Sequence, residues 1–434
     1  MAQENSYSGL IVVVPTRNRA QLAINAIDSV LRQANDEVFV LVSDNSTDAG
    51  EAETLGAHCA RLNSARVVYV RPPQPLAMCP HWQWALEQAL ARFDASHVLY
   101  LTDRMLFIAG RLMPLLALVK RYPGKVISYD LDRVNDLASP VRAEQVAWTG
   151  NVYEVRSSDL LSLTSQMMWL SAMPRMLNNV APRAVLRAVA DRFGDVCNST
   201  APDMCFAYRC LATVDSILFY ERALIVHYAL DRSNGESQSR GVMTKDHVDF
   251  LANLGSKPLN FAAPIPQIDT VANTILHEYN LVKESTGSPK FPEIDKRRYL
   301  ERIAQEAQSF ENAARRQETL ALVDAYRSKW NLKSLEHQIK NPRLQRAITL
   351  LRKVFAPKKL WVKFWSMAYI EQPRLFWKLV KALGLSRPAL VEAKEFVTVE
   401  EALDYASHQA RRRGWAKSPL KIFASARIIE KNVV

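Results

Sequence analysis

Residues 11–48 read IVVVPTRNRAQLAINAIDSVLRQANDEVFVLVSDNSTD, and this stretch decides the predicted fold. It opens with an apolar run at 11–14, whose β-branched residues are typical of a strand buried on both faces. The apolar side chains of residues 19–32 are spaced to lie on one face of a helix, and a second apolar run follows at 38–42. A strand, a helix and a strand in this order form a parallel pair with a right-handed crossover, which predicts an α/β fold.

Two polar stretches come directly after the two predicted strands. PTRNR begins at Pro15, and SDNSTD begins at Ser43. Ligands of open α/β sheets bind outside the carboxyl ends of the strands, so both stretches are expected to line one site. SDNSTD by itself is also typical of a loop that caps the next helix, because Ser, Asp and Asn favour such positions.

In this order, the two stretches resemble the signature of family 2 glycosyltransferases of the GT-A fold. The resemblance covers about residues 9–245. It implies a mostly parallel, Rossmann-like sheet flanked by helices, a mainly α-helical C-terminal region and an inverting reaction with a nucleotide-sugar donor. The donor nucleotide-binding residues that it implies are Pro15, Thr16, Arg17, Arg19 and Asp44, of which Asp44 reads the base.

The apolar run 97–101 predicts another strand, which ends in Thr102, Asp103 and Arg104. The resembled family has its D-x-D motif here, whose carboxylates hold Mg²⁺ or Mn²⁺ against the donor diphosphate. This sequence keeps Asp103 but has Arg104 in place of the last acidic residue. Three alternatives stay open: Asp103 and His227 bind the divalent metal, the Arg104 guanidinium itself holds the diphosphate, or Asp103 and Arg104 form a local ion pair with no ligand.

The candidate catalytic base is Asp203, which follows Pro202 at the start of a predicted helix. A helix N-terminus favours the ionised form of a carboxyl group. The segment resembles the family segment that supplies the base, and an inverting transferase needs a carboxylate to take the acceptor's hydroxyl proton. The alternative reading of Asp203 is a plain helix cap.

Apolar runs at 216–220 and 223–228 predict two strands that pair around Glu221 and Arg222. The following loop, residues 231–241, is polar and predicted to be flexible. It resembles a lid that closes on the donor, with Arg232 and Arg240 reaching the diphosphate. His227 is either a further metal ligand, as in some family members, or a buried strand histidine.

The chain has 434 residues and 48% hydrophobic residues, enough for a sizeable core and more than one domain. We expect a GT-A domain at 1–245, a helical connection and linker at 246–290, and a basic, mainly helical region at 291–434. The sequence shows no signal-peptide pattern, no apolar run of membrane-spanning length and no C-x-x-C spacing. These features predict a cytoplasmic protein.

The basic excess lies in the C-terminal third. Residues 291–434 contain 29 Lys and Arg against 15 Asp and Glu, whereas residues 1–290 contain 27 against 29. Within this third, residues 343–387 interleave eleven basic side chains with Trp, Phe and Tyr. This composition is typical of a helix on an anionic membrane surface, and equally of a helical subdomain whose aromatic residues pack inward.

The predicted function is glycosyl transfer to a hydroxyl of a saccharide or lipid-linked acceptor, in the assembly of cell-surface polysaccharide or glycolipid. The enzyme is expected in the cytoplasm, with peripheral attachment to the inner face of the membrane. The alternative is a non-catalytic GT-A-like protein whose basic C-terminal region binds nucleic acid or a membrane. Because the sequence contains no nucleic-acid-binding motif, nucleic acid is not the expected partner. Dinucleotide-binding and P-loop motifs are also absent.

Overall fold

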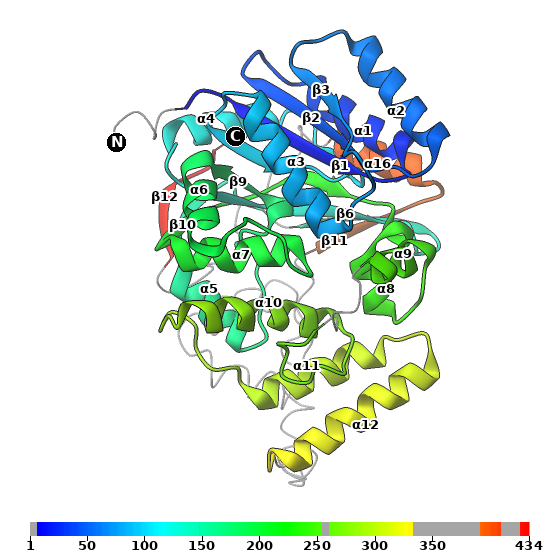
Figure 1. Ribbon diagram of the computed structural model, residues 1–434, viewed down its shortest axis with the longest axis vertical. Coiled ribbons are helices and arrows are strands. Elements are labelled where there is room, and N and C mark those ends of the chain that lie inside the picture. Colours follow the sequence, from blue (N-terminus) through cyan, green and yellow to red (C-terminus); the bar gives the residue numbers. More distant parts are fainter. Residues whose placement is uncertain (1–6, 147, 254–259, 333–390, 409–425, 434) are drawn as a thin grey trace, which may run out of the picture.

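The computed structural model describes residues 7–146, 148–253, 260–332, 391–408 and 426–433 (Figure 1). In this part of the chain twelve strands form one sheet, and most of them lie in the order β12-β8-β10-β6-β9-β4-β1-β2-β3. The strands are β1 (Leu10–Thr16), β2 (Val38–Asp44), β3 (Val67–Val70), β4 (His97–Tyr100), β5 (Met105–Phe107), β6 (Ile127–Asn135), β7 (Val141–Val146), β8 (Val152–Arg156), β9 (Asn179–Pro182), β10 (Ser216–His227), β11 (Val391–Phe396) and β12 (Arg427–Glu430).

Helices cover both faces of this sheet and extend beyond one end of it (Figure 1). The α-helices are α1 (Ala20–Leu31), α2 (Ala49–Leu62), α3 (Met78–Arg92), α4 (Leu112–Arg121), α5 (Ser157–Ser165), α6 (Arg183–Phe193), α7 (Pro202–Thr213), α8 (Asn234–Arg240), α9 (Lys245–Asn253), α10 (Val271–Thr286), α11 (Lys296–Gln308), α12 (Ala313–Lys329) and α16 (Val399–Ser407). Two short 3₁₀ helices are η1 (Met176–Asn178) and η2 (Leu230–Arg232).

The first strand separates the two main cores. Ile11 and Val13 point into the core that contains α3, α6 and α7, whereas Val12 and Val14 point into the core formed with α1 and α4. Successive side chains of a strand point to opposite faces, so an unbroken apolar run suits a strand covered on both sides. β1 pairs in parallel with β2 and with β4. The predicted α/β fold, with helices on both faces of one sheet, is confirmed. The sheet differs from the predicted mostly parallel one: among the described strands four pairs are parallel and seven are antiparallel, because most strands after β4 join as antiparallel partners.

The predicted hairpin between 216 and 228 is wrong. β10 is one strand that runs through Glu221 and Arg222, with a register shift against β6 between Tyr220 and Ala223. Both charged residues are buried. The Glu221 carboxylate accepts a hydrogen bond from the Tyr153 hydroxyl, and the Arg222 guanidinium lies 4.7 Å from the centre of the Trp148 ring. Because these partners contact both charged side chains inside the fold, the chain can continue through them as one strand.

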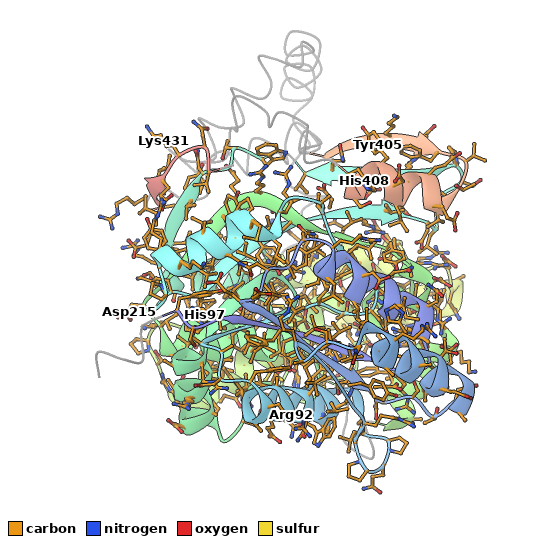
Figure 2. All side chains as sticks on the ribbon, turned by 90° about the horizontal axis from the view of Figure 1, so that it is seen from above. Arg92, His97, Asp215, Tyr405, His408 and Lys431 are labelled. Atoms are coloured by element: carbon orange, nitrogen blue, oxygen red, sulfur yellow. The ribbon has the colours of Figure 1, made fainter. Side chains whose placement is uncertain are left out.

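Strands from the end of the chain join the sheet of the predicted first domain. β11 pairs with β7, and β12 pairs with β8. Figure 2 shows Tyr405 of α16 and His408 directly after it at one end, and Lys431 after β12 at the other end, of the same side of the molecule. The boundaries predicted at 245 and 290 stay a prediction, although the strands at 391–396 and 427–430 complete a sheet begun before residue 245.

Two further observations concern predictions about membranes. Among the described residues, no helix is both long enough and apolar enough to cross a bilayer. The segment 343–387, predicted to meet an anionic membrane surface, lies outside the described residues.

Candidate active site

The two polar stretches meet at the ends of β1 and β2, as predicted. Asn18 ties them together, because its backbone N–H donates to the Ser46 hydroxyl at 2.8 Å and its side-chain oxygen accepts from the backbone N–H groups of Thr47 and Asp48. Asn18 has a φ of 54°, a conformation that asparagine adopts more readily than most residues. Asn18 is part of the PTRNR stretch, but the sequence pattern predicted no role for it.

Asp44 ends β2 and is fully buried. One of its oxygens accepts from the Ser46 backbone N–H at 2.8 Å, and the other accepts from the Tyr69 hydroxyl at 2.7 Å. The Arg71 guanidinium lies 3.7 Å from the second oxygen. The structure therefore places Asp44 beside PTRNR, with both oxygens bonded by protein donors. Its role as reader of the base stays a prediction.

Arg17 and Asn45 bind the loop that precedes α3. The Arg17 guanidinium donates to the Leu76 carbonyl at 3.2 Å, and the Asn45 amide donates to the same carbonyl at 2.8 Å. Pro15 lies buried within β1, which continues to Thr16 instead of ending at the proline. All five nucleotide-binding candidates thus lie at or directly after the ends of β1 and β2.

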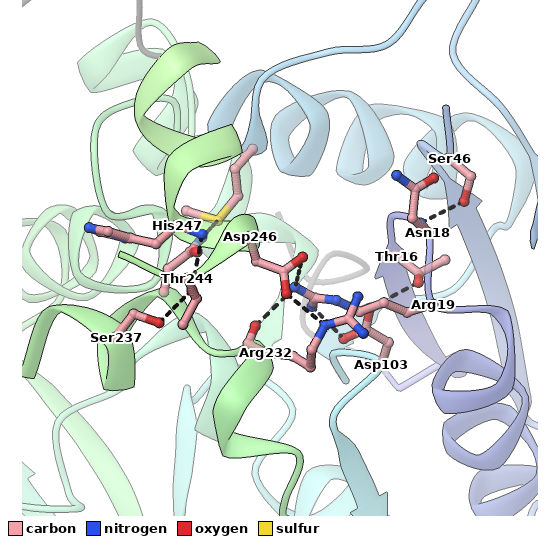
Figure 3. Close-up of polar contacts among 12 residues, drawn as sticks. Thr16, Asn18, Arg19, Ser46, Asp103, Arg232, Ser237, Thr244, Asp246 and His247 are labelled. Atoms are coloured by element: carbon pink, nitrogen blue, oxygen red, sulfur yellow. Dashed lines mark hydrogen bonds and ion pairs between the residues drawn. The ribbon is translucent and has the colours of Figure 1, made fainter. Parts of the chain in front are cut away.

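Asp103, just after β4, is bonded on both oxygens (Figure 3). One accepts from the Thr16 hydroxyl at 2.9 Å, and the other accepts from the Arg19 guanidinium at 3.4 Å. Arg19 also reaches Asp246 of α9 at 3.3 Å, and Asp246 pairs with Arg232 at 2.6 Å. Burial lowers the pKa of Arg19, but the carboxylates of Asp103 and Asp246 outweigh burial and leave that pKa raised.

The guanidinium of Arg104 donates a hydrogen bond to Nε2 of His227, at 2.7 Å. Burial lowers the pKa of Arg104 to about 10, and the group stays a cation at neutral pH. Burial also lowers the pKa of His227 well below its usual range, and the nearby charge of Arg104 lowers it further. His227 is therefore a neutral imidazole near the end of a strand, and its Nε2 accepts from Arg104.

The residues present do not fit a divalent metal. Hydrogen bonds from Thr16 and Arg19 occupy Asp103, and His227 gives its Nε2 lone pair to Arg104. A metal would need these atoms and would be repelled by the two guanidinium groups. The described part of the chain contains no cluster of three or more His, Cys, Asp or Glu side chains arranged to hold a metal ion.

The predicted lid segment is ordered into helices. Residues 230–232 form η2, and residues 234–240 form α8. Arg232 joins the network around Asp246, but Arg240 pairs with Glu311 at 2.6 Å, next to the start of α12. The structure thus places Arg232 in one network with Arg19 and Asp103. The described partner of Arg240 is Glu311, which lies outside that network.

A cavity of about 460 Å³ adjoins this network. Its walls are the N-terminal turns of α1 and α2 together with Arg19 and Arg232. Asp48 and Glu51 also line it, and the Glu51 carboxylate accepts the backbone N–H of Ala20 at 2.6 Å. Helix N-termini favour anions, but carboxylates of the chain already take these positions. Asp44 and Asp203 do not line this cavity.

Asp203 lies in the first turn of α7 and is half-buried. Burial raises the pKa of its carboxyl group, although the charge of Arg175 and backbone hydrogen bonds lower it. Asp130 of β6 is also buried, and burial raises its pKa to about 7. The charge of Arg175 lowers the pKa of Asp130, of Asp203 and of His227, so all three lie within electrostatic range of this guanidinium.

Sequence reasoning missed three residues of this site. Asp130 follows an apolar run, and a carboxylate directly after a predicted strand is a signal that could have identified it. Arg175 lies in an irregular segment with no such signal. Asp246 lies in α9. Its partners, Arg19 and Arg232, come close to it only when the chain folds.

Residues 11–164 match the family model described as glycosyl transferase family 2. The match lies within the stretch of the chain that resembles this family in sequence. A comparison with curated proteins found no match.

Several solved structures are similar to this chain. The crystal structure of S. aureus TarS is 13% identical, with a TM-score of 0.40. That match covers 71% of this chain and 50% of TarS, so the chain spans about half the length of that relative. The crystal structure of S. aureus TarS 1-349 in complex with UDP-GlcNAc is 15% identical, with a TM-score of 0.41. This second match covers 74% of this chain and 92% of the other.

Proposed function

We propose that this protein is an inverting glycosyltransferase, which moves a sugar from a nucleoside diphosphate donor to a hydroxyl of a saccharide or lipid-linked acceptor. The observation that carries the proposal is the group of arginines around Asp103, at the strand ends where PTRNR and SDNSTD meet. The glycosyl transferase family 2 match over residues 11–164 supports the same reaction class.

The donor's diphosphate needs positive charge. Arg19 and Arg232 lie within one network, and Arg104 lies next to Asp103 along the chain. Guanidinium groups bind phosphate oxygens through two parallel N–H donors. These bonds fix the orientation of the diphosphate, and the positive charge of the guanidinium offsets its negative charge. In this proposal the arginines stabilise the negative charge that develops on the leaving nucleoside diphosphate.

The acceptor's hydroxyl needs a base. Asp203 takes the hydroxyl proton while the oxygen attacks the anomeric carbon of the sugar, and the bond from that carbon to the phosphate oxygen breaks. The bonding electrons leave with the nucleoside diphosphate. A raised pKa suits this role, because a base works best when its pKa approaches the working pH. The positive charge of Arg175 opposes this rise in the pKa of Asp203, because it favours the ionised carboxylate.

The same proposal assigns no divalent metal to the reaction. The groups that would hold Mg²⁺ or Mn²⁺, Asp103 and His227, are bonded to Thr16, Arg19 and Arg104. Each guanidinium supplies a positive charge and hydrogen-bond donors, so two of them offer the diphosphate the charge that a divalent ion would offer. The proposed setting is the cytoplasmic assembly of cell-surface polysaccharide or glycolipid, at the membrane surface.

Thermal unfolding with nucleoside diphosphates tests the donor assignment. We expect one of UDP, GDP, CDP or ADP, supplied without metal, to raise the melting temperature, because a ligand of the folded state stabilises it by about 2.7 kcal/mol at 100 times its Kd. Asp44→Ala should reduce that shift, since it removes the predicted acceptor for the base. If no nucleoside diphosphate or its sugar conjugate shifts the transition, the proposed donor class is wrong.

Asp246 must release the arginines when the diphosphate binds. Its carboxylate bridges Arg19 and Arg232 at 3.3 and 2.6 Å, so a phosphate would compete for the same cations. We expect Asp246→Asn to bind the nucleoside diphosphate about threefold to fivefold more tightly, because a partly exposed ion pair contributes up to about 1 kcal/mol. Isothermal titration calorimetry measures the change.

A matched control for Asp246→Asn is Asp231→Asn, which removes one negative charge from an exposed position of the same segment. Its affinity should stay within about twofold of wild type, since screening weakens charges that are exposed to solvent. Weaker binding by Asp246→Asn would mean that Asp246 holds the arginines in place for the donor and does not compete with it.

A further inference from the structure

The segment that presents Asp203 depends on a residue far away in the chain. α7 begins after Ala201, whose side chain cannot cap a helix. The backbone N–H groups of Thr200 and Ala201 point instead to one carboxylate oxygen of Glu278, at 2.9 and 2.7 Å. Glu278 belongs to α10, outside the segment that matches the glycosyl transferase family.

α10 packs closely around this anchor, and Figure 1 shows it beside α7. The Glu278 residue is 1% exposed. On one side of it, the Thr200 hydroxyl lies 3.4 Å from Nε2 of His277. On the other side, the rings of Tyr279 and Tyr208 meet edge to face, with centroids 5.4 Å apart. These contacts join α10 to the start of α7 as one packed unit.

We propose that Glu278 is the positioning residue for the catalytic base: it fixes where α7 begins, and thereby where the Asp203 carboxylate lies. This inference rests on the proposed function. Asp203 comes two residues after Ala201, so a shift of the anchored N–H groups moves the carboxylate with them. A displacement of about 1 Å in a reacting group can lower a rate by about 10²-fold.

The anchor needs an acceptor oxygen and not a charge. Burial raises the pKa of Glu278 to about 7, because it disfavours the ionised form of the carboxyl group. A neutral amide has a carbonyl oxygen at nearly the same place and can accept the same two N–H groups. Glutamine should therefore replace glutamate here, whereas alanine leaves two partly buried N–H groups without their acceptor.

The experiment compares Glu278→Ala and Glu278→Gln in the full chain. It measures kcat for transfer from the sugar nucleotide that thermal unfolding identifies, and the Kd for its nucleoside diphosphate by calorimetry. We expect Glu278→Ala to lose about 10-fold to 100-fold in kcat with its Kd within about twofold of wild type. Glu278→Gln should retain kcat within about threefold. Glu284→Ala, at an exposed position of α10, is the matched control and should match wild type.

Two results would overturn the inference in an active wild-type enzyme: unchanged kcat in folded Glu278→Ala, or an equal loss in Glu278→Gln. If Glu278→Ala does not fold, Glu278→Asp decides, because its shorter side chain withdraws the oxygen and should lower kcat in a folded protein. A wild type that neither binds a nucleoside diphosphate nor transfers a sugar would contradict the proposed function instead.

Discussion

Replacement of Asp203 by asparagine should lower kcat by about 10²-fold to 10⁴-fold while donor binding stays nearly unchanged. The asparagine side chain has nearly the same shape but cannot take the proton from the hydroxyl of the acceptor substrate. Asp203 is not among the residues proposed to bind the diphosphate. Initial rates of transfer at saturating donor measure kcat, and calorimetry with the nucleoside diphosphate measures binding. Asp191→Asn, an exposed position on α6, is the matched control.

The pH dependence of Asp203→Asn has a definite sign. Because the pKa of Asp203 is raised in the folded state, this group favours folding below its unfolded pKa, and that contribution is lost as the pH rises through the folded value. Above that folded value the wild type carries a charge at this half-buried position that the variant lacks. We therefore expect the variant to be as stable as the wild type, or more stable, while it loses activity. Activity within a few-fold of wild type would remove Asp203 from the role of base.

The second large effect is expected at Arg104, where the sequence departs most from the family that it resembles. If guanidinium groups serve in place of a metal, transfer by the wild type should survive exhaustive treatment with EDTA. Arg104→Ala should lose about 10²-fold in kcat, because it removes a preorganised cation from the developing charge on the leaving group. Added Mn²⁺ should not restore the lost activity.

Three comparisons make the Arg104 result decisive. Arg121→Ala, whose exposed side chain pairs with Glu430, removes the same charge elsewhere and should be as active as wild type. Arg104→Asp would supply a second carboxylate beside Asp103. If this variant gains activity with Mn²⁺, or if EDTA stops the wild type, a metal serves the reaction and the arginine assignment fails.

The local pattern of the sequence determined the fold of the first part of the chain. The apolar runs at 11–14 and 38–42, with an amphipathic segment between them, specify a parallel pair, because each residue type favours one backbone conformation and one face. The pairing of parallel strands then brings their carboxyl ends to one edge. That is why the sequence alone places PTRNR and SDNSTD together.

Tertiary structure decided where charged side chains find their partners. Glu221 and Arg222 read locally as a turn, but Tyr153 and Trp148 from another part of the sheet accommodate them inside β10. Arg104 could have turned outward, and only the position of His227 shows that the two side chains are bonded. A hydrogen bond depends on distance and direction between atoms, and residues far apart in sequence acquire these only when the chain folds.

The same reason explains the contacts made by the later segments. β11 and β12 complete a sheet begun more than two hundred residues earlier, because edge strands leave backbone N–H and C=O groups unpaired until another strand reaches them. Asp246 meets Arg19 across 227 positions of the sequence, and Glu278 meets the start of α7 across 77. The residue types that can bind phosphate or accept a proton are visible in the sequence, but the folded backbone alone decides which of them face one another.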